Sequence, residues 1–138
     1  MRLFAYIILL FGLSLTSCEE NFNLEENTNT QFNVRVNGVE LPVLVRGNTA
    51  SKKIILFINS GPGLTSLDHA QLDLMNFKTI ESSYAIAYFD QRGTGNSQGT
   101  ITKGSLNLKQ YSKDIFDIIR VLETKYEQPE IRGTARNT

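Results

Sequence analysis

The chain has 138 residues, a length that suits one domain, and its 14 basic and 14 acidic side chains give a formal net charge of zero. Nothing in this balance suggests a nucleic-acid partner, which would require a concentrated positive face, so we expect none. The single cysteine excludes an internal disulfide and a zinc site built from cysteines. We expect neither a metal nor another cofactor.

The first 17 residues have the layout of a secretory signal. Arg2 precedes an apolar run that extends to Leu15. This run is shorter than the roughly 20 apolar residues that a transmembrane helix needs. The sequence L-T-S-C at residues 15–18 resembles the lipobox of bacterial lipoproteins, in which the cysteine receives lipid and becomes the first mature residue. This resemblance implies that Cys18 anchors the protein to a membrane of the cell envelope. The alternative is a plain signal peptide with a chance cysteine near the cleavage site.

A polar segment rich in Asn, Glu and Thr follows the cysteine. Such a composition buries too little apolar surface to order itself. We therefore predict that residues 18–30 comprise the lipidated cysteine and a flexible tether. The folded domain is then expected over residues 31–131, and the polar residues 132–138 are expected to form an irregular tail.

An antiparallel hairpin is predicted over residues 31–46. Apolar and polar residues alternate up to Val36 and again from Val39, which is typical of half-buried strands. Asn37-Gly38 lies between the two runs and favours a tight turn, because both residue types tolerate positive φ. Pro42 cannot donate a hydrogen bond to a neighbouring strand and therefore predicts that the second strand lies at a sheet edge.

Two continuous apolar runs, Ile54–Ile58 and Tyr84–Phe89, predict strands that are covered on both faces. Residues 66–80 show a moderate helical pattern between them. A stronger helix is predicted over residues 107–126, where apolar residues recur at spacings of three and four.

The strong helix has a polar cap in Asn107 and a stop in Pro129. The order of hairpin, strand, helix, strand and helix predicts an α/β fold with a parallel central sheet.

Two motifs resemble the proline iminopeptidase branch of the α/β hydrolases. "IILFINSGPG", Ile54–Gly63, resembles its strand followed by H-G-G-P-G, and "YFDQRGTGNS", Tyr88–Ser97, resembles its D-Q-R-G-x-G-x-S loop. With the hairpin and the helices, the resemblance covers most of residues 31–128. It implies the N-terminal half of an α/β-hydrolase sheet: an antiparallel hairpin, then parallel strands with covering helices.

The first motif implies an active-site loop. The resemblance assigns one half of an oxyanion hole to the backbone N–H of Gly61, with Pro62 and Gly63 completing the turn. Asn59 and Ser60 depart from the family pattern, which has His and Gly at these positions. Asn59 can still hydrogen-bond to the neighbouring loop, whereas Ser60 adds a side chain where the loop is tight. A simple turn that ends a strand is the alternative reading.

The second motif implies a structural loop that borders the active site. Asp90 and Arg92 are expected to fix it through ionic and backbone hydrogen bonds, and the glycines allow its bends. The alternative for Arg92 is to bind a substrate carboxylate. The loop residues carried over from the family are Asp90, Gln91, Arg92, Gly93, Gly95 and Ser97.

Residues 95–99 spell G-x-S-x-G, the pattern of a serine nucleophile elbow. An elbow requires a strand directly before the serine and a helix directly after it. Ser97 lies seven residues past Asp90 and is followed by a segment with two glycines and β-branched residues. We therefore predict that Ser97 is not a nucleophile.

The family's nucleophile follows the strand after the 107–126 helix. From Ile131 this chain reads IRGTARNT, which is polar and is not expected to form a central strand. Without a central strand here, Ile54–Ile58 would be left as an exposed apolar edge of the sheet. The only histidine, His69, is expected to be a partly exposed structural residue, so no catalytic triad is complete.

The resemblance implies hydrolysis of peptide or ester bonds by a serine nucleophile. We expect this chain to be a truncated form that is inactive alone. One alternative is a non-catalytic surface lipoprotein that acts as a binding module. Another is a split enzyme in which a separate C-terminal chain completes the fold.

Overall fold

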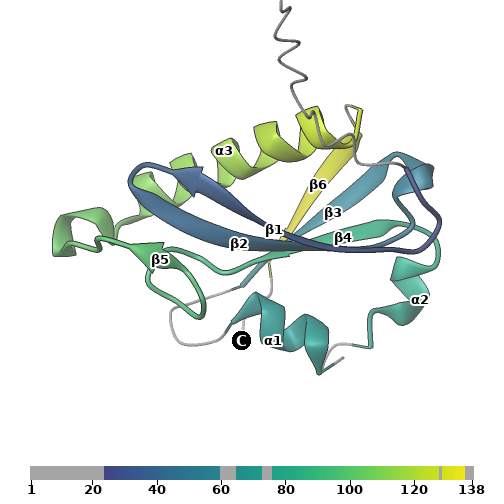
Figure 1. The fold of residues 1–138 in the computed structure, drawn as a ribbon, viewed down its shortest axis with the longest axis horizontal. Coiled ribbons are helices and arrows are strands. Elements are labelled where there is room, and N and C mark those ends of the chain that lie inside the picture. The colour runs from purple at the N-terminus through teal and green to yellow at the C-terminus, as the bar shows by residue number, and fades with distance from the viewer. Residues whose placement is uncertain (1–23, 60–64, 73–75, 128, 136–138) are drawn as a thin grey trace, which may run out of the picture.

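The computed structural model describes residues 24–59, 65–72, 76–127 and 129–135. They form one mixed sheet with helices on both faces (Figure 1). The strands are β1 (Thr28–Val36), β2 (Val39–Gly47), β3 (Lys53–Ile58), β4 (Ala85–Phe89), the short β5 (Gln98–Gly99) and β6 (Glu130–Ala135). The helices are α1 (Ser66–Gln71), α2 (Lys78–Glu81) and α3 (Leu108–Lys125), with 3-10 turns η1 (Thr49–Ser51) and η2 (Lys103–Ser105).

The sheet order is β1-β2-β4-β3-β6, and β5 adds to one end of β2. β1, β2 and β4 pair in antiparallel fashion, whereas β3 pairs in parallel with both β4 and β6. The predicted hairpin and the parallel central strands are confirmed. α3 covers one face of the sheet, and α1 and α2 lie on the other (Figure 1).

Each face has its own apolar core, which explains the continuous apolar runs of β3 and β4. Successive side chains of a strand point to opposite faces. Leu56 and Phe89 therefore pack on the α3 side with Ile118 and Leu122. Phe57 and Tyr88 pack on the other side with Leu67 and Ala70.

β2 is an internal strand, so the edge position predicted from Pro42 is wrong. Pro42 lies between the residues of β2 that pair with β5 and those that pair with β4. Its carbonyl accepts a hydrogen bond from the Asp90 N–H at 3.2 Å. In the register of β2 with β4, Pro42 lies opposite Asp90, so the proline cannot make the reciprocal N–H bond and the ladder stops there, at the end of β4.

The ordered part of the chain begins before residue 31, within the segment predicted to be a flexible tether. Thr28–Thr30 belong to β1, and the Thr28 hydroxyl is buried at 2.8 Å from the hydroxyl of Thr49. The Glu25 carbonyl also accepts backbone hydrogen bonds from Thr49 and Ala50. The tether prediction is therefore wrong for residues 25–30, because backbone pairing orders polar residues that could not order themselves by burial. The signal and Cys18 lie outside the described residues.

β6 corrects the prediction of an irregular tail from residue 132. Glu130–Ala135 pair in parallel, residue by residue, with Lys53–Ile58. β3 is therefore enclosed between β4 and β6, and the predicted exposed apolar edge does not exist. The ladder uses backbone groups, and the polar side chains of β6 are tolerated because Glu130 and Arg132 are exposed and paired with each other at 2.6 Å.

The segment 66–80 is not one helix. α1 ends at Gln71 and α2 begins at Lys78, and Asn76 between them has a φ of 51°. A left-handed residue interrupts helical hydrogen bonding. The long helix, by contrast, is confirmed as α3, and the Asn107 side chain caps it by accepting from the Gln110 N–H at 3.0 Å.

The buried tyrosines predict a loss of stability in alkali. Burial raises the pKa of Tyr126 to about 12. Burial, with a hydrogen bond to the Glu81 carboxylate, raises the pKa of Tyr88 even further. The folded chain then holds protons that the unfolded chain releases above pH 10, so the free energy of unfolding falls as the pH rises from about 10 towards about 12.

Urea unfolding across this pH range is the measurement. Tyr126→Phe is expected to decline less steeply than the wild type, because the folded and unfolded variants no longer differ in protonation at this position. Tyr84→Phe, at an exposed tyrosine, is the control and should retain the wild-type dependence. A wild-type slope in Tyr126→Phe would contradict the assignment.

Candidate functional site

The carboxyl ends of β3 and β4 bring the two sequence motifs together. Parallel strands end at the same edge of a sheet, which is where open α/β sheets bind ligands. β3 ends at Ile58 and leads into Asn59, and β4 ends at Phe89 and leads into Asp90. The Gln91 side-chain amide donates to the Asn59 backbone carbonyl at 2.6 Å. The two loops are thus joined by one hydrogen bond across the sheet edge.

The oxyanion-loop candidates Ser60, Gly61, Pro62 and Gly63 lie outside the described residues. Asn59, which precedes them, is buried. Its contact with the neighbouring loop uses the backbone carbonyl, a group that every residue type provides. This bond therefore does not depend on the departure from the family pattern at position 59.

Asp90 is fully buried and accepts backbone hydrogen bonds from α1 and from its own loop. Its Oδ1 accepts from the Leu67 N–H at 3.3 Å and its Oδ2 from the Asn96 N–H at 3.1 Å. Leu67 lies in the first turn of α1, where the N–H groups have no helical partner. Asp90 therefore fastens α1 and its own loop to the end of β4.

Arg92 points into the fold and binds α3. Its Nε and Nη2 donate to Asp114 Oδ2 and Oδ1 at 2.7 and 2.9 Å, and both side chains are almost fully buried. The hydrogen bonds to Asp114 raise the pKa of Arg92 above its already high ordinary value. With 2% of its surface exposed, Arg92 has no room for a substrate carboxylate.

The turn from Gly93 to Ser97 is closed by the serine. Ser97 Oγ accepts the Gly93 N–H at 3.0 Å, and the Ser97 N–H donates to the Thr94 carbonyl at 3.0 Å. The residues after Ser97 form β5 and not a helix. The strand-turn-helix context of a nucleophile elbow is therefore missing around Ser97.

Asp114 is the main residue that the sequence analysis missed. Besides Arg92 it accepts hydrogen bonds from Asn37 and Gln110, at 3.2 and 2.9 Å, and so ties the hairpin turn, the loop and α3 together. A signal was present, because position 114 falls on the apolar stripe of the helix between Tyr111 and Ile118. An acidic residue on a buried stripe requires a buried partner.

His69 lies on α1, where it is half-buried and its ring forms a T-shaped contact with Phe57, with ring centroids 6.2 Å apart. Its Nδ1 is buried and has no hydrogen-bond partner in the described part of the chain. No serine, acid or base of a triad is brought together among the described residues.

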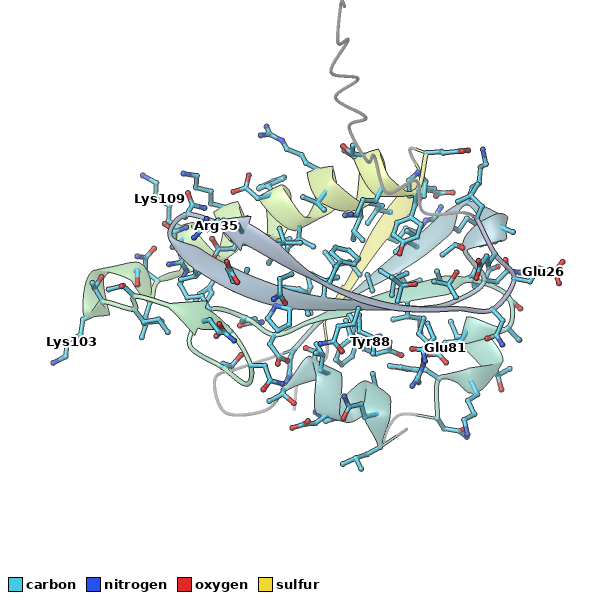
Figure 2. All side chains as sticks on the ribbon, viewed as in Figure 1. Glu26, Arg35, Glu81, Tyr88, Lys103 and Lys109 are labelled. Carbon is cyan, nitrogen blue, oxygen red and sulfur yellow. The ribbon has the colours of Figure 1, made fainter. Side chains whose placement is uncertain are left out.

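A second polar cluster lies on the α2 face, away from these loops. Glu81 accepts from Arg46 Nε at 2.7 Å and from the Tyr88 hydroxyl at 2.8 Å. Figure 2 shows Glu81 and Tyr88 beneath the sheet. An open hollow of about 660 Å³ lies beside Arg46 and Glu81. A smaller one of about 290 Å³ lies between Lys53 and Arg132 at the amino ends of their strands. Neither hollow is lined by the two motif loops.

Among the described residues, no group of three His, Cys, Asp or Glu side chains is placed to hold a metal ion. The described helices also include none with the length and apolar character needed to cross a membrane.

Comparison with known proteins shows similarity at the level of structure. No protein-family model matches the sequence, and no curated protein matches it significantly. An epoxide hydrolase from Vigna radiata is similar over 79% of this chain and 32% of its own, with 23% identity and a TM-score of 0.57. A proline iminopeptidase-related protein from Thermus thermophilus is similar over 79% of this chain and 36% of its own, with 18% identity and a TM-score of 0.63.

A predicted CIB-like hydrolase from Thermoplasma acidophilum is similar over 78% of this chain and 51% of its own, with 22% identity and a TM-score of 0.56. This chain thus spans a third to a half of these three solved structures. The strand order β1-β2-β4-β3-β6 places β3 between the parallel strands β4 and β6. By this order and by the structural similarity, the chain has a partial α/β-hydrolase fold.

Proposed function

We propose that this chain is the N-terminal part of a hydrolase that resembles proline iminopeptidases and cleaves peptide or ester bonds with a serine nucleophile. The observation that supports this most is the joined pair of motif loops at the carboxyl ends of β3 and β4. Gln91 holds the loop after β4 against Asn59, the residue that leads into the proposed oxyanion loop. An oxyanion hole needs backbone donors whose orientation is set before the reaction, and this bond holds the residue that precedes them.

In this proposal Gly61 supplies a backbone N–H to the developing oxyanion. β6 lies next to β3 and parallel to it, the place from which the family's nucleophile would follow. The serine, the acid and the histidine would then come from sequence beyond Ala135. Ser97 is committed to the turn that it closes. The 138 residues alone are therefore proposed to be inactive, and small peptides or esters are the proposed substrates of the whole enzyme.

We also propose that the protein is a lipoprotein of the bacterial cell envelope, anchored through lipid on Cys18. The support is the short apolar run and the L-T-S-C sequence at residues 15–18.

A binding module is the second candidate. It is favoured by the completeness of the polar network around Asp90, Arg92 and Asp114, because a sheet that is well fastened without a triad suits a non-catalytic surface protein. A separate C-terminal chain that completes the sheet next to β6 would instead restore an enzyme.

Labelling with a fluorophosphonate probe separates these candidates. The full chain, purified in detergent, is expected to have the circular dichroism spectrum of a folded protein and to remain unlabelled by the probe. The nucleotide sequence downstream of codon 135 is expected to encode G-x-S-x-G directly after β6, in one of the three reading frames. A protein that continues in that frame should be labelled at its serine, and alanine there should lower turnover by about a millionfold.

Ser97→Ala in the longer protein is the control and should leave labelling intact. Labelling of the 138-residue chain at Ser97 would contradict the proposal. Absence of a downstream G-x-S-x-G in every frame would favour the binding module.

A further inference from the structure

Although the net charge of the chain is zero, one end of the molecule carries an excess of basic side chains. Between Asp90 and Asp114 the sequence contains no acidic residue but has Arg92, Lys103, Lys109 and Lys113. Arg92 is neutralised by Asp114. The three lysines are exposed, and none of them forms an ion pair with another described residue. Figure 2 shows Lys103 and Lys109 at one end of the molecule, whereas Glu26 and Glu81 lie towards the other.

The same segment exposes apolar side chains, which we group with the lysines as the 101–113 tip. Ile101, Leu106 and Leu108 are 39%, 45% and 81% exposed. Ile101 and Leu106 are neighbours, because a Cβ built on Gly93 would lie within 3.5 Å of both. Leu108 is two residues from Leu106 and so within about 7 Å along the chain. Single exposed apolar residues are common, but an apolar cluster with lysines on the same segment marks an interaction surface.

Local hydrogen bonds hold the tip in shape. Ser105 Oγ accepts from the Thr102 N–H at 3.1 Å and donates to the Thr102 carbonyl at 2.8 Å. The Asn107 side-chain amide donates to the Gly104 carbonyl at 2.6 Å while its oxygen caps α3. The apolar side chains are therefore presented on a preformed turn, which lowers the entropy cost of binding.

We propose that the 101–113 tip docks on the surface of an anionic lipid bilayer. Aliphatic side chains flanked by lysines suit this surface, because the apolar groups enter the boundary of the acyl chains while the ammonium groups stay among anionic headgroups. A soluble protein partner would be expected to offer acidic side chains to the lysines, and a second copy of the tip would bring like charges together. The charge pattern therefore disfavours a second copy, and lipid is favoured because a bilayer offers anionic groups and an apolar layer side by side. The docking does not depend on lipid at Cys18.

The absence of tryptophan from the chain makes a site-specific probe available. Leu108→Trp in the full chain is mixed with vesicles of phosphatidylglycerol and phosphatidylcholine whose acyl chains carry bromine. Tryptophan emission is expected to shift to the blue and to be quenched by the bromine. Leu72→Trp is the matched control, because Leu72 is also an exposed leucine but lies on the opposite layer, and its emission should not change. Leu106→Trp is a second probe in case Leu108→Trp disturbs α3.

The charge contribution is tested by Lys103→Gln with Lys109→Gln in the Leu108→Trp chain. Each lysine near an anionic surface contributes about 1 kcal/mol, so the ratio of docked to undocked tip should fall about 30-fold. The ratio compares the docked and undocked tip in chains that are already attached to the vesicles. Attachment through the apolar N-terminal segment is common to both states and therefore does not change the ratio.

Four results would overturn the proposal. The first is absence of quenching at both 106 and 108 in chains that sediment with the vesicles. The second is equal quenching at 72, and the third is equal docking on phosphatidylcholine alone. The fourth is a concentration-dependent blue shift without vesicles, which would assign the tip to a second copy of the chain.

Discussion

Asp114→Ala is expected to lower the free energy of unfolding by about 3–5 kcal/mol, because it leaves the buried guanidinium of Arg92 without its charged partner. Asp114 accepts two hydrogen bonds from Arg92 and one each from Asn37 and Gln110. Its loss therefore releases the 90–97 loop from α3 and from the hairpin turn. Urea unfolding followed by circular dichroism measures the change.

Asp117→Ala is the matched control on the same helix. Asp117 accepts one hydrogen bond, from Asn37 at 3.2 Å at an exposed position, and its removal should change stability by no more than about 0.5 kcal/mol. Replacing the buried pair together, as Arg92→Met with Asp114→Leu, should recover much of the lost stability, because no charge is then left unpaired. Equal losses in Asp114→Ala and Asp117→Ala would contradict this account of the loop.

Gly95→Ala is expected to destabilise the chain by about 2–4 kcal/mol, of which about 1 kcal/mol comes from the backbone and the rest from overpacking. Gly95 has a φ of 50°, which an L side chain adopts at a cost. A Cβ at this position would also lie 2.6 Å from Thr65 Cγ2 and 2.7 Å from Asp90 Cγ. Asp90 would have to move, and its bonds to the N–H groups of Leu67 and Asn96 would be strained.

Gly38→Ala separates the two contributions. Gly38 has a φ of 80° in the hairpin turn, and a Cβ there would meet nothing within 4 Å. Its substitution should cost only the backbone contribution of about 1 kcal/mol. Hydrogen exchange at the Leu67 and Asn96 amides should accelerate in Gly95→Ala and stay unchanged in Gly38→Ala. Equal destabilisation by the two substitutions would show that Asp90 is not tightly enclosed.

Local sequence patterns were sufficient for much of the fold. Alternation and Asn37-Gly38 define the β1-β2 hairpin, because both the side-chain period and the turn are properties of a few adjacent residues. The apolar runs of β3 and β4 and the stripe of α3 were equally readable. The two glycine-rich motifs also indicated which strand ends would meet.

Other features depended on contacts between distant segments. Residues 25–30 are polar, and their order comes from pairing with β2 and Thr49. Pro42 reads as an edge residue, and only the staggered ends of β4 and β5 make it compatible with an internal strand.

The sequence by itself determined the elements whose signal is periodic, the order of those elements and the loops that carry the hydrolase-like motifs. Only the tertiary structure decided that residues 130–135 form a strand beside β3 and that Asp114 is the partner of Arg92. The physical reason is the same in both cases. A parallel ladder joins backbone groups whatever the side chains are, and a buried ion pair joins residues 22 positions apart, so neither leaves a repeat that a short window of sequence can reveal.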